Sequence, residues 1–319
     1  MSSMTTTTTN MPLHEERPRR SLFSVPGADE RKLEKARSLQ ADAVVLDLED
    51  GVAYDQKDVA RAMVTQTLLD SSKSFGNAEL CVRINALDTE DLAIQDLEAI
   101  LACGRLQAIV IPKVESPDDI QFVRQKMHQV QRCHPQDVRI IAAIESAKGM
   151  LNLRQIAETS CEKTDVGKLD ALVFASEDYC ADLEAIRTPL ATELLWARSQ
   201  LVTTAKAYQL QAIDMVHIDF RNLEALATEC VTGRQLGFTG KQAIHPNQLE
   251  TIHKEFSPSL QDLQFATNCR QQYEAAVSKG KGACEVDGIV VDMPVYKWAI
   301  KICQRAEKAG MSPTTTTEE

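Results

Sequence analysis

Residues 169–179, LDALVFASEDY, decide the fold class that we expect for this chain. The stretch begins as an apolar, β-prone run and ends in two adjacent acids, as a buried parallel strand does when it delivers carboxylates to a sheet edge. Two other apolar runs end in the same way, at Glu49-Asp50 and at Glu145. Because the carboxyl ends of the strands carry the chemistry of α/β proteins, we predict that these acids meet at one mouth.

Strand-like and helix-like segments alternate along the chain. The predicted strands are residues 21–25, 43–48, 79–84, 108–112, 139–144, 171–175, 211–216 and 241–244. The predicted helices are residues 29–39, 57–69, 90–101, 117–130, 149–158, 192–208 and 223–236. Eight βα units in a row, without fingerprint glycines after the first strand, favour a TIM (β/α)8 barrel over a doubly wound sheet.

The pattern changes after residue 256. A helical segment to about residue 278, an extended piece at 285–294 and a last helix to about residue 308 follow, and a barrel needs none of them to close. Both chain ends are rich in threonine. We therefore predict four parts, which are a disordered tail over 1–18, the catalytic TIM barrel over 19–256, a helical extension or lid over 257–310, and a disordered tail over 311–319.

The composition is that of an ordinary globular protein with a net charge of -11, which argues against nucleic-acid partners. No apolar run approaches the roughly 18 residues of a membrane span. Basic residues gather near the start of the chain, where they form either a site for a small polyanion or a solvated helix face. Nine scattered cysteines without a C-x-x-C pair indicate a reducing compartment. The first ten residues lack the arginines of a transit peptide.

Glu145 and Asp178 are the best candidates for a metal pair, because Mg²⁺ prefers oxygen ligands and is usually held by one or two carboxylates. The alternative is that each acid caps a helix or belongs to a structural ion pair. Glu49 and Asp50 could form an outer shell that holds metal-bound waters or orients a lysine, or could complement a helix dipole.

Arg83 ends an apolar strand and must find a buried partner, which could be a substrate carboxylate, an enolate oxygen or a structural acid such as Glu49. Lys113 follows a proline into a loop, so we interpret it as a charge partner of the acids. No Ser/His/Asp set, nucleophile elbow, Walker loop or nicotinamide fingerprint is visible.

Nine short motifs follow one another between residues 19 and 310. They are PG at 26–27, LDLEDGV at 46–52, VRIN at 82–85, IPKVE at 111–115, IESAKG at 144–149, SEDY at 176–179, AID at 212–214, GKQAIHP at 240–246 and VDMP at 291–294. Together they resemble the citrate lyase beta subunit-like (HpcH/HpaI aldolase) family. The resemblance implies a TIM barrel that uses Mg²⁺, acts on acyl-CoA thioesters of hydroxy acids and commonly forms trimers.

The resemblance also implies residue roles. Glu145 and Asp178 match the metal ligands, Arg83 matches the arginine at the substrate's acyl portion, and Asp292 matches the catalytic aspartate. The positions that line the CoA thioester site are matched by Ser24, Arg31, Lys35, Ile244 and His245. Two departures stand out, because Ser24 replaces an aromatic residue and Glu184 stands where Asp-Leu-Gly is common.

The implied reaction is the retro-Claisen or aldol-type cleavage of citramalyl-CoA to acetyl-CoA and pyruvate, as in the eukaryotic branch of the family. Asp292 would act as the acid–base residue in a neighbouring subunit of a homotrimer. The alternatives are a malyl-CoA lyase or thioesterase, with β-methylmalate or malate synthase side activity, and a non-catalytic CoA-binding subunit of a lyase assembly. One methyl group is worth only about 1–3 kcal/mol, so the residues leave the substrate open. The resemblance implies a mitochondrial location, with the cytoplasm as the alternative.

Overall fold

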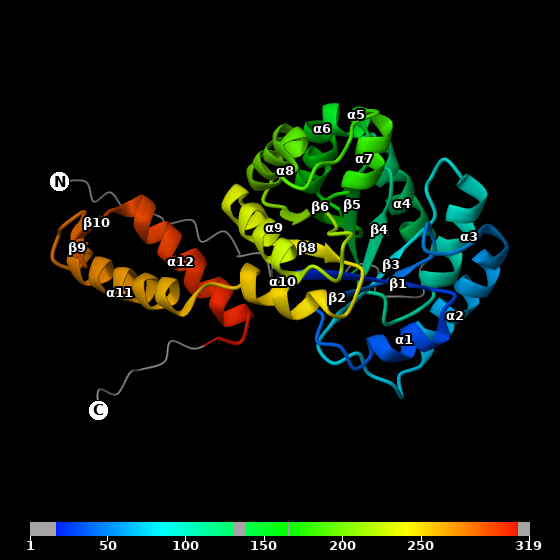
Figure 1. Ribbon diagram of the computed structural model, residues 1–319, viewed down its shortest axis with the longest axis horizontal. Coiled ribbons are helices and arrows are strands. Elements are labelled where there is room, and N and C mark those ends of the chain that lie inside the picture. Colours follow the sequence, from blue (N-terminus) through cyan, green and yellow to red (C-terminus); the bar gives the residue numbers. More distant parts are fainter. Residues whose placement is uncertain (1–16, 131–137, 165, 312–319) are drawn as a thin grey trace, which may run out of the picture.

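The computed structural model describes residues 17–130, 138–164 and 166–311, which contain a closed barrel of parallel strands in chain order (Figure 1). The barrel closes where Leu22 and Phe23 pair with Gln242 and Ala243. The predicted TIM barrel is therefore confirmed. Its strands are β1 (Ser21–Pro26), β2 (Ala43–Asp47), β3 (Glu79–Arg83), β4 (Ala108–Ile111), β5 (Arg139–Ile144), β6 (Lys168–Phe174), β7 (Gln211–Asp214) and β8 (Gly240–Ala243).

Helices cover the outside of the barrel and bury its apolar outer face. They are α1 (Glu30–Ala36), α2 (Lys57–Leu69), α3 (Glu90–Ile100), α4 (Pro117–Gln129), α5 (Ala147–Leu151), α6 (Leu153–Glu158), α7 (Ser176–Asp182), α8 (Leu195–Ala207), α9 (Leu223–Leu236) and α10 (Gln248–Phe256), with 3-10 turns η1 (Tyr54–Gln56), η2 (Thr159–Cys161) and η3 (Thr192–Leu194).

Two of these helices were missing from the prediction, and one predicted helix is divided into two. The short α7 starts directly after β6, and α10 follows β8, so neither has the long periodic pattern that reveals a helix. The predicted helix over 149–158 is two short helices, α5 and α6, that meet at Asn152.

The barrel interior is apolar in the middle and polar at both ends. Alternate residues of the strands point inward, and small or branched side chains such as Ala143 and Val173 form the inner cluster. At the amino-terminal end, the guanidinium of Arg19 fills the floor and bonds to Glu79, Asp170 and Gln211. The opposite end remains open as the mouth.

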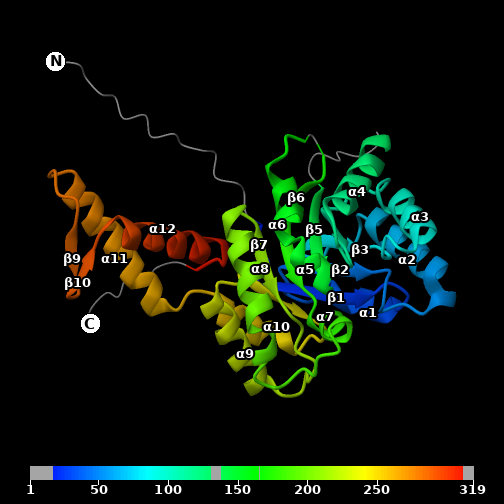
Figure 2. The ribbon, with the colours of Figure 1, turned by 90° about the horizontal axis from the view of Figure 1, so that it is seen from above.

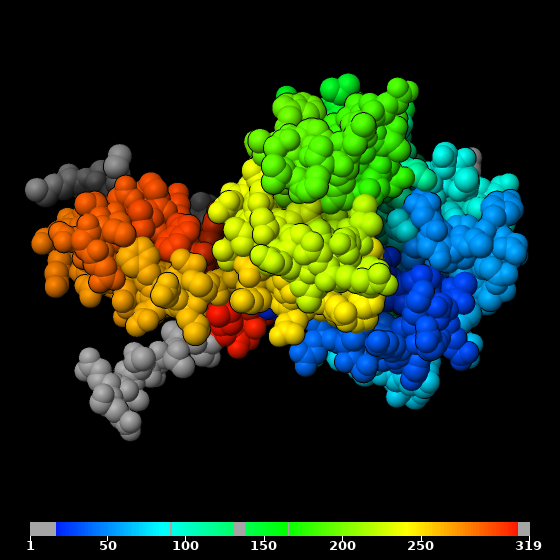
Figure 3. All heavy atoms as spheres, viewed as in Figure 1, coloured from blue at the N-terminus to red at the C-terminus, as the bar shows by residue number. Residues whose placement is uncertain are grey.

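The chain after α10 forms an arm that projects from the barrel (Figures 2 and 3). Its helices α11 (Leu260–Val277) and α12 (Met293–Lys308) enclose a small core of their own. Between them, β9 (Cys284–Val286) and β10 (Ile289–Val291) pair as a hairpin, where we had expected a simple extended piece. Asp287 and Gly288 both have positive φ, at 50° and 78°, as a tight two-residue hairpin turn requires.

Candidate active site

The mouth of the barrel is organised by Arg83 at the end of β3. Its Nε and Nη2 donate to the two carboxylate oxygens of Asp47, each at 2.7 Å. Asp47 is buried and also accepts from the backbone N–H groups of Glu49 and Gly51. The main partner of Arg83 is therefore Asp47, which sequence reasoning missed. The signal was the position of both residues at the ends of adjacent strands, where they pair in register.

The remaining Arg83 nitrogen, Nη1, faces the predicted outer acids. It lies 3.1 Å from Glu49 and 3.9 Å from Asp50. On its other side, Glu49 pairs with Lys113 Nζ at 3.1 Å. Burial raises the pKa of Glu49, although Arg83 and Lys113 oppose this shift. The prediction that Glu49 orients a lysine thus has a geometric counterpart, and Asp50 lies at the exposed edge.

Lys113 has a φ of 50°, which is rare for a residue with a side chain. This left-handed turn directly after Pro112 lets the Lys113 ammonium reach Glu49 at the mouth. Strained backbone of this kind persists where surrounding contacts hold it, and it is concentrated at functional sites. The interpretation of Lys113 as a charge partner of the acids agrees with this geometry.

Glu145 follows β5 and is almost completely buried at 3% exposure. Burial, followed by the negative charges of Glu49 and Asp178, raises the pKa of Glu145 to about 8. Its Oε2 has no hydrogen-bond partner among the described residues. A buried carboxylate oxygen without a partner is costly, so this oxygen is suited to a ligand that supplies positive charge.

Asp178 does not end a strand, as we had predicted, but lies in the first turn of α7. It is exposed, and it shares two hollows with Glu145. One is a cavity of about 170 Å³ in the barrel mouth, and the other is a cavity of about 650 Å³ beside it, towards α4 and α5. Glu145 and Asp178 therefore lie where the two cavities adjoin.

This arrangement fits Mg²⁺. The mouth carries the carboxylates of Glu49, Asp50, Glu145, Glu177 and Asp178, and the cations Arg83 and Lys113 lie among them. No group of three or more acids, histidines or cysteines in the described part of the chain forms a complete cage. Mg²⁺ does not need such a cage, because it is usually held by one or two carboxylates while water and substrate fill its other positions. The unpartnered oxygen of Glu145 is what a cation would satisfy.

The predicted CoA-binding residues are divided between two places. Ser24 and Ile244 line the mouth cavity. Beside them, the ring of His245 stacks on Phe220 with centroids 4.4 Å apart. Arg31 and Lys35 are exposed on α1, which follows the carboxyl end of β1, and they do not line either cavity. The structure thus brings three of the five residues to the mouth or its rim.

Asp292 caps α12, because its carboxylate accepts from the backbone N–H of Val295 at 3.2 Å. It is exposed on the arm, and neither mouth cavity is lined by any arm residue that the structure describes. In this structure Asp292 therefore serves as the N-cap of α12. A catalytic role for Asp292 in its own barrel has no geometric support here, and its role in a neighbour stays a prediction.

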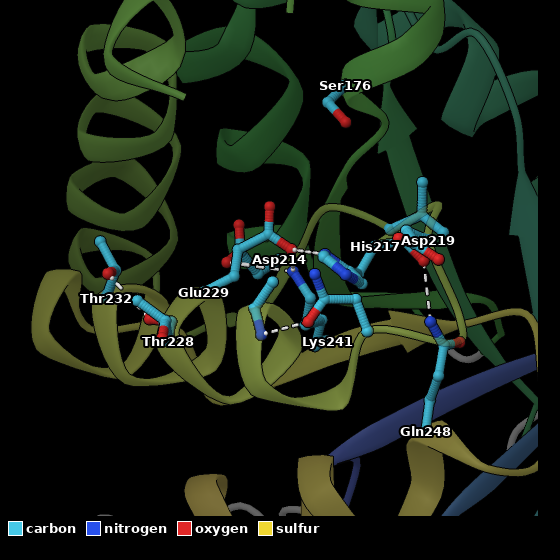
Figure 4. A network of polar contacts seen from close by, with 12 residues as sticks. Ser176, Asp214, His217, Asp219, Thr228, Glu229, Thr232, Lys241 and Gln248 are labelled. Carbon is cyan, nitrogen blue, oxygen red and sulfur yellow. Dashed lines mark hydrogen bonds and ion pairs between the residues drawn. The ribbon is translucent and has the colours of Figure 1, made fainter. Parts of the chain in front are cut away.

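A second polar cluster lies beside the mouth, between β7, β8 and α9 (Figure 4). Lys241 is fully buried on β8 and lies 3.1 Å from Glu229, which also contacts His217 at 2.9 Å. Burial would raise the pKa of Glu229, but the His217 hydrogen bond and the charges of Lys241 and Arg187 lower it to about 2. Sequence reasoning placed Lys241 in the eighth predicted strand and gave it no role of its own.

The closed barrel, with its acidic and partly buried mouth, defines a TIM-barrel protein whose site is built from the carboxyl ends of its strands and the loops that follow them. A sequence model for carbon–carbon bond lyases of the TIM-barrel fold matches residues 195–311. The chain belongs to the HpcH/HpaI aldolase/citrate lyase family, whose model matches residues 20–246. The family expected from the motifs is confirmed.

Individual relatives resemble the chain over most of its length. It is 40% identical to the mitochondrial citramalyl-CoA lyase of Homo sapiens over 90% of this chain and 85% of that protein. It is 36% identical to a (3S)-malyl-CoA thioesterase of Cereibacter sphaeroides over 88% of this chain and 91% of that protein. The solved CitE protein of Mycobacterium tuberculosis, in complex with magnesium, acetoacetate and coenzyme A, is 30% identical with a TM-score of 0.70, covering 90% of this chain and 98% of that one.

Proposed function

We propose that this chain is a Mg²⁺-dependent carbon–carbon lyase that cleaves citramalyl-CoA to acetyl-CoA and pyruvate. The observation that carries the proposal is Glu145, a buried carboxylate with an unpartnered oxygen beside a cavity that Asp178 also lines. The identity to the human citramalyl-CoA lyase and the magnesium and CoA bound by the CitE relative support it.

Glu145 and Asp178 would hold the metal. When bound, Mg²⁺ would supply positive charge to negative oxygens of the substrate. Arg83 is held rigidly by Asp47, so its Nη1 is prepared to bind the substrate's carboxylate or the enolate oxygen. Glu49 and Asp50 would orient Arg83 and Lys113 at the mouth.

Cleavage breaks the bond between the hydroxyl-bearing carbon and the methylene carbon next to the thioester. The hydroxyl group gives up its proton and becomes the keto group of pyruvate, while the electron pair of the broken bond passes into the thioester as an enolate. We assign the proton transfers to Asp292, whose carboxylate takes the hydroxyl proton and returns one to the enolate carbon. The protonated carbon becomes the methyl group of acetyl-CoA. The proton taken from the hydroxyl group is thus matched by the proton added to carbon, and no electrons are gained or lost.

Asp292 would act on a neighbouring subunit, in a homotrimer. The arm carries Asp292 away from the body of its own barrel, and no described arm residue lines the mouth cavities of that barrel. We therefore propose that residues 19–256 form the catalytic barrel and that residues 257–310 form a lid over the next barrel. A mitochondrial location is proposed because the human relative is a mitochondrial protein.

Malyl-CoA thioesterase is the second candidate, because a relative with that activity is 36% identical. The mouth cavity has an apolar lining that includes Val45, Val110 and Ala143. Such a lining would accommodate the methyl group that distinguishes citramalyl-CoA from malyl-CoA. One methyl in an apolar pocket is worth about 1–3 kcal/mol, so we expect a preference of about 10- to 200-fold for citramalyl-CoA.

One assay separates these functions. The protein is incubated with citramalyl-CoA or malyl-CoA, with Mg²⁺ or with EDTA, and the released keto acid and free thiol are both measured. A lyase releases keto acid without free thiol, a thioesterase releases free thiol, and a CoA-binding subunit releases neither. Activity that survives EDTA, or an active Glu145→Gln variant, would contradict the metal assignment.

A mixing experiment tests the role of Asp292 in a neighbouring subunit. Asp292→Asn and Glu145→Gln proteins, each inactive alone, should regain partial activity when they are unfolded and reassembled together. Mixed oligomers without activity would place Asp292 in its own subunit. Substantial activity of Asp292→Asn alone would remove it from the mechanism.

A further inference from the structure

A chain of ion pairs connects the polar cluster of Figure 4 to α7, the helix that carries Asp178. Its central residue is Arg187, in the segment between α7 and η3. Arg187 Nη2 donates to Glu229 at 2.9 Å and to the carbonyl oxygen of Val216 at 2.8 Å. Its other terminal nitrogen, Nη1, bonds to the carboxylate of Glu177. Glu177 is the neighbour of Asp178 in the first turn of α7.

We propose that Arg187 is a positioning residue that holds Asp178 ready for the metal. The inference rests on the proposed function, because it takes Asp178 as a ligand of Mg²⁺. Arg187 does not line either mouth cavity, so it would act through Glu177 rather than through contact with substrate.

The first support is that Asp178 has no anchor of its own. No hydrogen bond or ion pair to its carboxylate is found within the described residues, and its side chain is exposed. The helix that carries it, α7, has only seven residues. A ligand that is not fixed by its own bonds depends on the groups around it, and such supporting groups commonly contribute 10- to 100-fold to metal affinity.

The second support is that Arg187 lies within a strained segment. Glu184 and Ala191, which lie three and four residues on either side, have φ values of 53° and 49°. Each conformation costs about 1–3 kcal/mol in a residue with a side chain, and it persists only where other contacts fix the backbone. The three bonds of Arg187 to Glu177, Glu229 and Val216 are contacts that can do so.

The third support is that the far end of the chain of ion pairs is rigid. Glu229 is held by His217 and by Lys241, which is fully buried in the layer between the barrel and α9. Around the same layer, Gln248 accepts from the backbone N–H groups of Ile244 and His245 and donates to the carbonyl oxygen of His217. Through Glu229, Arg187 therefore connects α7 to the rigid cluster on β8 and α9. Gln248 connects the residues that follow β8 to the same cluster.

The test compares two arginines that have similar partners. Arg124 bonds to Glu162 and to the carbonyl oxygens of Thr159 and Gly167, but it lies at the amino-terminal end of β6, away from the mouth. Mg²⁺ affinity is measured by calorimetry on the full-length protein, for the wild type, Arg187→Gln, Arg187→Lys, Arg124→Gln and Asp178→Asn, together with the melting temperature of each.

We expect Arg187→Gln to weaken Mg²⁺ binding by about 10- to 100-fold. Arg187→Lys should recover part of the loss, because an ammonium group can still pair with one of the two glutamates. Arg124→Gln should lower the melting temperature without changing Mg²⁺ affinity. In turnover assays, Arg187→Gln should need more Mg²⁺ for half-maximal rate, while its rate at saturating Mg²⁺ stays within about twofold of the wild type.

The outcomes separate this inference from the proposed function. If Asp178→Asn loses Mg²⁺ affinity and Arg187→Gln keeps it, the positioning role is wrong and the metal site stands. If Asp178→Asn binds Mg²⁺ like the wild type, the metal assignment itself is wrong. Should Arg187→Gln fail to fold, Glu177→Gln breaks the same link. Wild-type Mg²⁺ affinity in that variant would also overturn the inference.

Discussion

Replacing Glu145 with glutamine should stabilise the metal-free protein, and the gain should grow with pH. Glutamine keeps the shape of the side chain but removes the charge that burial opposes. Glu145 is 3% exposed, and its pKa rises from the ordinary 4.5 to about 8. Between these pH values, the folded protein holds a proton that the unfolded chain has released. Stability of the wild type must therefore fall as the pH rises from about 4.5 to about 8.

The size of the effect follows from the same shift. One unit of pKa corresponds to 1.36 kcal/mol, so the buried charge costs about 3 kcal/mol at pH 7 and on the order of 4–5 kcal/mol above pH 8. At pH 5 the cost is below about 1 kcal/mol. Glu145→Gln avoids this cost at every pH. Its advantage over the wild type should therefore increase by about 3 kcal/mol between pH 5 and pH 8.

Urea unfolding with a chelator present, at one protein concentration and at pH 5, 7 and 8.5, measures this advantage. Glu98→Gln, which removes an exposed acid on α3, is the control for a general charge effect. Added Mg²⁺ should stabilise the wild type at pH 7 and leave Glu145→Gln unchanged. An advantage that is the same at pH 5 and pH 8.5 would refute the argument that burial and neighbouring charges raise the pKa of Glu145.

Substitutions at three further positions test other parts of the structure by urea unfolding. Arg19→Leu leaves Glu79 and Asp170 without their buried partner on the barrel floor and should cost about 3–5 kcal/mol, so a loss under about 1 kcal/mol would contradict this role. Glu184→Gly should gain up to about 1 kcal/mol, because glycine adopts a φ of 53° without strain, whereas Glu184→Ala should gain nothing. Glu229→Gln should cost about 3 kcal/mol at pH 7, since the pKa of Glu229 is lowered to about 2. That contribution is present above about pH 4.5 and is lost as the pH falls toward 2, so the cost should be less than half as large near pH 3.

The barrel could be predicted because its signals are local. Apolar runs of strand length alternate with helical periodicity, and Ser116 before Pro117 marks a helix start that the structure shows with its capping box. The acids after the strands could be placed at one end of the barrel for the same reason. The family motifs added the proposed roles of Glu145, Asp178 and Asp292, which position alone leaves open.

The contacts that join distant segments could not be predicted. The Asp47–Arg83 pair depends on the register of β2 and β3, which follows from the closed barrel rather than from either strand alone. Lys241 interrupts the apolar pattern of β8, and it can be buried there because Glu229 approaches from α9. Arg19 raised no site prediction, because its partners Glu79 and Asp170 lie on two other strands.

Because the arm has a core of its own, it can unfold locally while the barrel stays folded. The apolar cluster of the arm includes Ala266, Tyr273 and Ala299, and none of its members belongs to the apolar clusters of the barrel. Amide hydrogens of α11 and α12 should therefore exchange with solvent through local opening events that leave the barrel intact. If Asp292 acts in the barrel of a neighbouring subunit, as proposed, such an opening would inactivate that neighbour's active site. Loss of activity on heating would then precede any change in the barrel, and a spectroscopic probe of the barrel would not detect it.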